Sequence, residues 1–385
     1  MSVPRRAAPT TDMLRVRSES GKGRDGHIGS ELDSLINDAA RLGDTTAAAR
    51  AVGMRCNFGE SSHSDHVDRH ITALIDEHLP RCHDLSVRSR AKAHAALFFS
   101  LVDYQRCRRY YLESIDDARA ATDDDALAFA HSFAYVVLTH PDDWDHRLDA
   151  AYDLLRLGEV LNENAYRFEG LYLLFSCQLQ RGDPALRGTL VAAERILEIA
   201  LATAPVARSR AMTAYMGLVL AVRFSQGRSA EIRPLLIEIA KAQPEFAGRA
   251  GALAWAAACE GDWDGVEEQC RRSDDGRNLP HDVAWIGTVY LLGRSVAARG
   301  DVARSATIDA LLTPHTNRMA WAGHTAIGPV DLAIAELAAV RGDNERAIEH
   351  LGHAERFCSR LHAPAFATQL ADARTRLTPN ATPSR

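Results

Sequence analysis

The stretch "VDLAIAELAAVRGDNERAIEHLGHAERFCSRL", residues 330–361, decides the fold. Val330, Ile334 and Leu337 recur at steps of four and three, the spacing that gives an α-helix one apolar face. The same spacing resumes after the interruption "RGD", at Ala347, Leu351, Ala354, Cys358 and Leu361. Two amphipathic helices joined by so short a turn form a helical hairpin.

The turn of this hairpin recurs along the chain. Gly342 suits the left-handed position that ends a helix, and the side chain of Asp343 can cap the next one. Equivalent turns are predicted at Gly43-Asp44, Gly182-Asp183, Gly261-Asp262 and Gly300-Asp301, with a variant at Gly227. From Gly182 onward the intervals are 34 to 45 residues, close to the period of stacked helix pairs. The sequence therefore predicts an all-α fold, a tetratricopeptide-like right-handed solenoid of helical hairpins.

The predicted domain organisation is one repeat domain with two tails. Residues 1–30 are rich in Arg, Ser, Gly and Pro without any period, which favours a disordered tail. Residues 31–377 carry the helical pattern, and residues 378–385 form a second disordered tail.

Composition narrows the class of protein. The 385 residues are 46% apolar and carry a net charge of −6, so we expect a globular protein that does not bind nucleic acid directly. The seven cysteines are scattered and form no C-x-x-C pair, which favours reduced thiols in a cytoplasmic protein. The N-terminal stretch lacks the apolar run of a secretory signal, and no stretch is apolar enough to span a membrane.

A histidine-rich stretch, "SSHSDHVDRHITALIDEH", raises the question of a metal. His66 and His70 are four apart, on one helix face, and His63 and Cys56 are the nearest further ligands. A similar run, "HPDDWDHRLDAAYD", keeps the acidic positions and replaces the counterparts of both histidines. We therefore favour a solvated helix start and predict neither metal nor cofactor.

In that interpretation the apolar residues of the helix, Ile71, Leu74 and Ile75, face the core and the two histidines face solvent. Two acidic runs elsewhere are likewise predicted to have structural roles and no bound metal. Asp123 to Asp125 would cap a helix, and Asp116-Asp117 would lie on an exposed face.

Candidate ligand-binding residues lie in the second half of the chain. The segment 312–328 is the longest break in the helical pattern there, and long structured loops are often functional. Trp321 lies in this segment beside Arg318 and His324, and Trp285 follows a second break. These four residues are the predicted ligand or partner site, with core packing of the tryptophans as the alternative.

Four stretches carry a family resemblance. They are "AVGMRCNFGESSHSDHVDRHITALIDEHLP", "YYLESIDDARAATDDDALAFAHSFAYVVLTHPDDWDHRLDAAYDLL", "LPHDVAWIGTVYLLGRSVAARGD" and "GHTAIGPVDLAIAELAAVRGDNERAIEHLGHAERFCSRLHAPAFATQLADARTRL". The chain resembles the tetratricopeptide-like region of actinobacterial signalling proteins with an ATPase of the STAND type, including LuxR-type transcriptional regulators and cyclase-ATPase proteins. The resemblance implies a regulatory role.

The enzymatic and DNA-binding parts of that family have no counterpart in this sequence. A P-loop requires G-x-x-x-x-G-K-[ST], but Gly23 follows Gly21-Lys22, and Val16 stands where the first glycine belongs. No cyclase, helix-turn-helix or common hydrolase motif is found.

The predicted function is therefore binding without catalysis, with a protein or peptide partner and a regulatory role, for which transcription is one candidate setting. One alternative is a small-molecule sensor with a pocket in the C-terminal half. A further alternative is an enzyme with an unfamiliar site in the solenoid groove.

Overall fold

The computed structural model describes residues 25–57, 68–183, 219–242, 248–279, 284–322 and 325–377, with scattered positions between 185 and 217. The described residues are mostly helical with almost no strand, which confirms the all-α class. They divide into two compact units, with the division after Ala130. The sequence predicts one continuous domain over 31–377. No helix in the described part of the chain is both long and apolar enough to cross a membrane.

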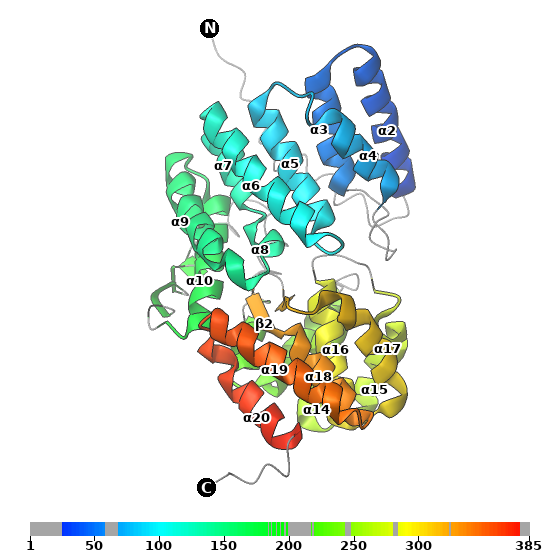
Figure 1. Cartoon of the computed structure of the whole chain (residues 1–385). Coiled ribbons are helices and arrows are strands. Elements are labelled where there is room, and N and C mark those ends of the chain that lie inside the picture. The colour runs from blue at the N-terminus through cyan, green and yellow to red at the C-terminus, as the bar shows by residue number, and fades with distance from the viewer. Residues whose placement is uncertain are drawn as a thin grey trace. The chain divides into compact units, whose positions relative to one another are not determined.

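The first unit is built from helix pairs. Its helices are α2 (Asp25–Arg41), α3 (Thr45–Asn57), α4 (Arg69–His78), α5 (Leu85–Phe99), α6 (Tyr104–Ala121) and α7 (Asp124–His131). Helix α2 packs on α3, α3 on α4 and α5, and α5 on α6 (Figure 1). Helix α2 begins inside the stretch 1–30 that the sequence assigns to a tail. Residues 1–24 and 378–385, the rest of the predicted tails, lie outside the described residues.

The second unit contains more helices and one small sheet. Its α-helices are α8 (Ala134–Val137), α9 (Trp144–Val160), α10 (Asn164–Arg181), α13 (Arg233–Ala242), α14 (Arg249–Glu260), α15 (Trp263–Arg272), α16 (Trp285–Arg299), α17 (Val302–Leu312), α18 (Val330–Val340), α19 (Asn344–Arg360) and α20 (Ala367–Leu377). Short 3-10 turns lie at η2 (Pro141–Asp143), η3 (Ser229–Ile232), η4 (Asp274–Gly276), η5 (Thr313–His315) and η6 (Pro364–Phe366). Successive pairs α14/α15, α16/α17 and α18/α19 each pack together, and α16 contacts both α14 and α18.

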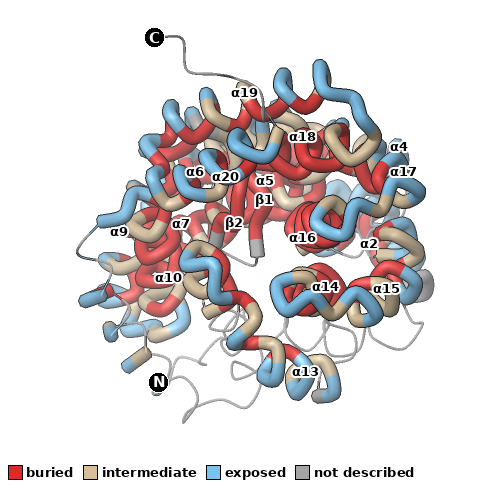
Figure 2. The backbone as a smooth tube through the Cα atoms, turned by 90° about the horizontal axis from the view of Figure 1, so that it is seen from below, coloured by how far each residue is buried: buried red, intermediate tan, exposed pale blue. Residues whose placement is uncertain are grey.

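The first helices of these pairs form the centre of the second unit. Every residue of α16 from Trp285 to Val296 is buried, and so is every residue of α18 from Val330 to Ala338. Figure 2 shows α16 in the colour of buried residues. Even the charged residues here are buried in pairs, because Arg294 of α16 binds Glu336 of α18, with Nε and Oε2 2.8 Å apart.

The predicted glycine turns are confirmed. The φ angles of Gly43, Gly182, Gly227, Gly261, Gly300 and Gly342 are all positive, between 62° and 78°. After Gly43, Gly261, Gly300 and Gly342 the aspartate that follows caps the next helix. For example, the Asp343 carboxylate accepts a hydrogen bond from the backbone nitrogen of Arg346 over 3.2 Å, and Asp301 does the same for Arg304.

The sheet is a β-hairpin that the sequence does not predict. Strands β1 (Met319–Ala322) and β2 (Thr325–Pro329) pair antiparallel at the predicted break 312–328. The interruption of the helices is therefore confirmed, but the segment forms a β-hairpin where the sequence predicts a loop. Gly328 has a φ of 154°, and a Cβ atom there would lie 2.1 Å from the hydroxyl oxygen of Tyr290 on α16. Only glycine fits this contact between hairpin and helix.

Two side-chain predictions need correction. In α4, Ile71 and Ile75 are fully buried, but Leu74 is only partly buried because it lies at the edge of the inward face. In α6, Asp116 is exposed, whereas Asp117 is buried beside Arg88. Burial alone would raise the pKa of Asp117, but hydrogen bonds from Arg88 and from a neighbouring lysine outweigh it and lower the pKa.

The predicted cap is confirmed, since Asp123 accepts hydrogen bonds from two backbone nitrogens of α7.

Candidate functional site

Three of the four predicted site residues lie in the described part of the second unit. Trp285, at the start of α16, is buried, and the edge of its ring contacts His315 with centroids 5.3 Å apart. Arg318 directly precedes β1, and its carbonyl accepts a hydrogen bond from the Val330 nitrogen. His324 lies outside the described residues. Ligand binding by these residues stays a prediction.

Trp321 of β1 is also a core residue, with 7% of its surface exposed. The guanidinium of Arg147 lies over its ring, 4.0 Å from the centroid. The same guanidinium donates hydrogen bonds to the carbonyls of Ala134, Tyr135 and Leu138, at distances of 2.7 to 3.3 Å. Arg147 therefore closes the end of α8 and holds Trp321 in place.

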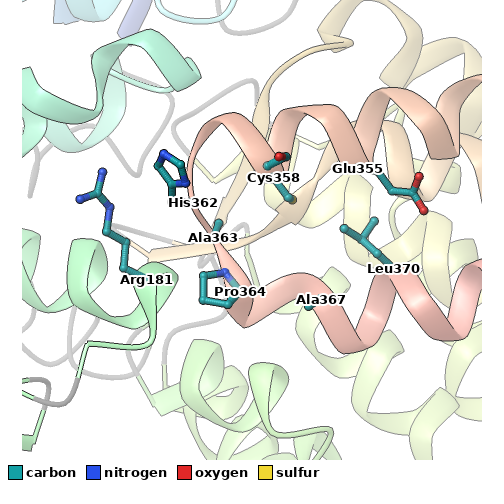
Figure 3. A pocket seen from close by; sticks show the side chains of 9 residues that line it. Arg181, Glu355, Cys358, His362, Ala363, Pro364, Ala367 and Leu370 are labelled. Carbon is teal, nitrogen blue, oxygen red and sulfur yellow. The ribbon is translucent and has the colours of Figure 1, made fainter.

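An open groove lies between α19, α20 and the end of α10, and we call it the α19–α20 groove (Figure 3). Its volume is about 740 Å³. It is lined by Arg181, Glu355, Cys358, Ser359, His362, Ala363, Pro364, Ala367 and Leu370. The floor consists mostly of small or apolar side chains, and charged groups lie at the rim.

The chain reversal after α19 creates this groove. His362 adopts a left-handed backbone with φ of 48°, and Pro364 begins the 3-10 turn that leads into α20. The link also contacts α10, because a Cβ atom at Gly182 would lie 3.6 Å from the Pro364 ring. Ala363 and Ala367 leave space where larger side chains would close the groove.

The rim carries one accessible cation. The guanidinium carbon of Arg181 lies over the ring of Trp144, 4.3 Å from its centroid. Within the part of the chain that the structure describes, Arg181 pairs with no carboxylate. By contrast, Glu355 on the other side is engaged by Arg374, whose Nε lies 2.8 Å from Oε1. The groove therefore offers a preoriented positive charge to a ligand.

The groove contains one thiol, that of Cys358. Burial raises its pKa to about 12, so the thiol is protonated at neutral pH. A protonated, buried thiol is a poor nucleophile, and Cys358 contributes apolar surface to the floor.

A second cluster brings together Asp331 of α18 with His350 and His353 of α19, and we call it the Asp–His cluster. The Nδ1 atoms of His350 and His353 lie 2.8 Å and 3.4 Å from Oδ1 of Asp331. The other carboxylate oxygen, Oδ2, accepts a hydrogen bond from the backbone nitrogen of Asn317 over 2.8 Å. This carboxylate therefore ties the segment before β1 to α18 and α19.

The candidate metal ligands that the sequence suggested lie in or near the histidine-rich stretch before and within α4. Of that histidine-rich stretch, His63 and His66 lie outside the described residues. The Nε2 atom of His70 lies 3.1 Å from a carboxylate oxygen of Asp33, and burial raises the pKa of the Cys56 thiol to about 12. The overlooked signal was H-x-x-H at 350–353, inside the stretch that decides the fold.

Comparison with known protein families and with curated proteins finds no match for this chain. The resemblance to STAND-type regulators therefore remains a prediction.

Proposed function

We propose that this chain is a non-enzymatic, tetratricopeptide-like protein that binds an extended segment of a partner protein in the α19–α20 groove. Paired helices that contact the next pair through their first helices support the proposed right-handed solenoid. The observation that carries the binding function is the groove itself, with an apolar floor and an accessible cation at its rim. Helical-repeat proteins commonly present such surfaces to peptides.

The chemistry of the groove defines the segment that would fit. A carboxylate of the partner would bind the guanidinium of Arg181, which Trp144 already orients. Small apolar side chains next to that carboxylate would cover the floor formed by Ala363, Ala367 and Leu370. We therefore propose a partner segment that combines an acidic residue with small apolar residues.

A regulatory role, with transcription as one candidate setting, rests on the resemblance to STAND-type proteins. The second candidate function is binding of a small acidic metabolite, because a volume of about 740 Å³ lies in the range of small-molecule sites. The enzyme alternative receives less support, since Cys358 is protonated and Glu355 is engaged by Arg374.

The test is affinity purification from the native host with four forms of the chain as bait. Arg181→Glu reverses the cation, and Ala367→Glu places a charged side chain in the groove. Arg356→Glu is the matched control, because Arg356 is exposed on α19 but does not line the groove. We expect both groove variants to recover at least about tenfold less partner than the wild type, because each places a carboxylate against an acidic segment and like-charge contacts cost several kcal/mol. The control should recover as much as the wild type.

Two results would count against this proposal. Recovery of no reproducible partner would remove the protein-binding function, and equal recovery by all four baits would remove the groove as its site. A thermal-shift screen of acidic metabolites distinguishes the second candidate. A compound that stabilises the wild type and the control but not Arg181→Glu, with no protein recovered, would favour the small-molecule function.

A further inference from the structure

We propose that the Asp–His cluster binds a divalent transition-metal ion such as zinc. Its three ligand atoms, one carboxylate oxygen and two imidazole nitrogens, all lie within 4.8 Å of one another. Two histidines and one carboxylate, with a further position left for water, is a ligand set that zinc commonly adopts. This proposal is independent of the groove and of its partner.

The two distances from the Asp331 carboxylate oxygen to the imidazole nitrogens suit such an ion with little movement. Ligand atoms bound to tetrahedral zinc at about 2.0 to 2.1 Å lie about 3.3 Å apart. Nδ1 of His353 already lies 3.4 Å from Oδ1 of Asp331, and Nδ1 of His350 lies 2.8 Å from it. The His350 contact would need to lengthen by about 0.5 Å as the metal replaces the shared proton.

A purely structural hydrogen bond explains only part of this arrangement. One histidine, His350, is enough to satisfy Oδ1 of Asp331. Nδ1 of His353 is shielded from solvent and forms no hydrogen bond within the described part of the chain, although it faces the same oxygen. A buried nitrogen without a hydrogen bond is costly, and a metal ion would satisfy it.

The surroundings also resemble those of a metal site. The Asn317 nitrogen holds Oδ2 of Asp331 and so orients Oδ1 toward the histidines, as outer-shell donors do for metal ligands. His350 and His353 are one turn apart on α19, which puts their rings on one face. Asp331 is fully buried, whereas 29% of the His353 side chain is exposed, so the cluster lies at the edge of the core.

The ion would link three segments that are otherwise joined through hydrogen bonds and packing. Asp331 lies in the first turn of α18, the histidines lie on α19, and Asn317 precedes the β-hairpin. Metal binding should therefore stabilise the fold of this region, as ligation that occurs only in the folded state does.

The test uses the full chain, stripped with EDTA and titrated with Zn²⁺ by calorimetry and with Co²⁺ by visible absorption. We expect one tight equivalent of Zn²⁺ and Co²⁺ absorption bands in the wild type. His353→Gln and His350→Gln should each weaken binding by at least about tenfold, as loss of a ligand does. His83→Gln, which alters an exposed histidine between α4 and α5, is the matched control. The double variant His63→Ala/His66→Ala controls for the histidine-rich stretch.

Folding of each variant is checked by circular dichroism. His353 is partly exposed, so His353→Gln is expected to fold even if the variant of buried His350 does not. Zn²⁺ should also raise the melting temperature of the wild type and not that of His353→Gln. The proposal would be overturned by wild-type affinity no tighter than that of folded His353→Gln. It would also be overturned if tight Zn²⁺ binding were lost in His63→Ala/His66→Ala but retained in both His350→Gln and His353→Gln.

Discussion

Replacement of Gly251 by alanine tests whether successive helix pairs are in contact as closely as the structure shows. Gly251 lies on α14 where this helix meets α16. A Cβ atom at this position would lie 2.5 Å from the carbonyl oxygen and 2.8 Å from the Cα of Thr288. Ordinary contacts begin near 3.4 Å, and both atoms belong to the backbone, so the two helices would have to separate by about 0.9 Å.

Two opposing terms set the expected magnitude. Alanine favours a helix over glycine by about 1 kcal/mol. Overpacking costs about 1 to 3 kcal/mol, and contact with two rigid backbone atoms places this case at the upper end. We therefore expect Gly251→Ala to lower the free energy of unfolding by about 2 kcal/mol. Gly352 of α19 is the matched control, because the nearest atom there, 3.3 Å away, is the flexible end of Arg356. Gly352→Ala should stabilise the chain by about 0.5 to 1 kcal/mol.

The assay is guanidinium denaturation followed by tryptophan fluorescence, which reports on α14 through Trp255. The two alanine variants should differ by about 3 kcal/mol in opposite directions from the wild type. If Gly251→Ala were as stable as the wild type, α14 and α16 would not be in contact at this point and the stacking of pairs would be refuted.

Three further predictions concern other parts of the chain. Ile75→Ala should lower the free energy of unfolding by about 2 to 5 kcal/mol through lost burial, whereas His70→Ala should change it by less than about 0.5 kcal/mol. Urea denaturation measures both values, and equal losses in the two variants would contradict the assignment of Ile75 to the buried face of α4. The pKa of Asp153 is lowered to about 2, chiefly by a hydrogen bond from His131, so the stability that this carboxylate adds is complete above 3.8 and lost as the pH falls through 2. Melting temperatures of the wild type and Asp153→Asn should accordingly differ most above pH 3.8 and converge near pH 2, and a constant difference would refute the assignment. Cys259 is the exposed cysteine among the seven. A thiol reagent should therefore modify one thiol quickly in the native protein and none in Cys259→Ser. Rapid modification of several thiols would contradict the burial of the other six cysteines.

The helical hairpins could be predicted because the information that sets them is local. Gly342 and Asp343 lie next to each other, and each acts on the backbone within a few residues, so the turn depends little on the rest of the chain. Periodic apolar residues likewise identified α18 and α19. Leu74 shows the limit of this reasoning, because a period defines an apolar face but not how far a neighbour covers its edge.

The hairpin β1–β2 and the α19–α20 groove could not be predicted because both depend on contacts between distant segments. The hairpin fits against α16 through Gly328 and Tyr290, which are far apart in sequence. The groove exists because Pro364 and the end of α10 lie together, and its cation, Arg181, is oriented by the ring of Trp144. None of these residues forms a motif, and only the tertiary structure gives them a shared role.

The Asp–His cluster lies between these two cases, because the sequence contains enough to find it. His66 and His70 form a pair on one predicted helix face, as His350 and His353 do, so histidine spacing alone cannot choose between the two. The deciding feature is the turn. In an antiparallel helical hairpin, residues at equal distances from the turn lie opposite each other, and Asp331 and His353 are each eleven residues from Gly342. The turn that the sequence already predicts thus places the carboxylate of Asp331 beside the pair His350 and His353. A search for metal sites in helical repeats should therefore ask which residue lies at the same distance on the other side of the nearest glycine turn from each histidine pair. A pair that faces a carboxylate in this way is a stronger candidate than a pair that does not.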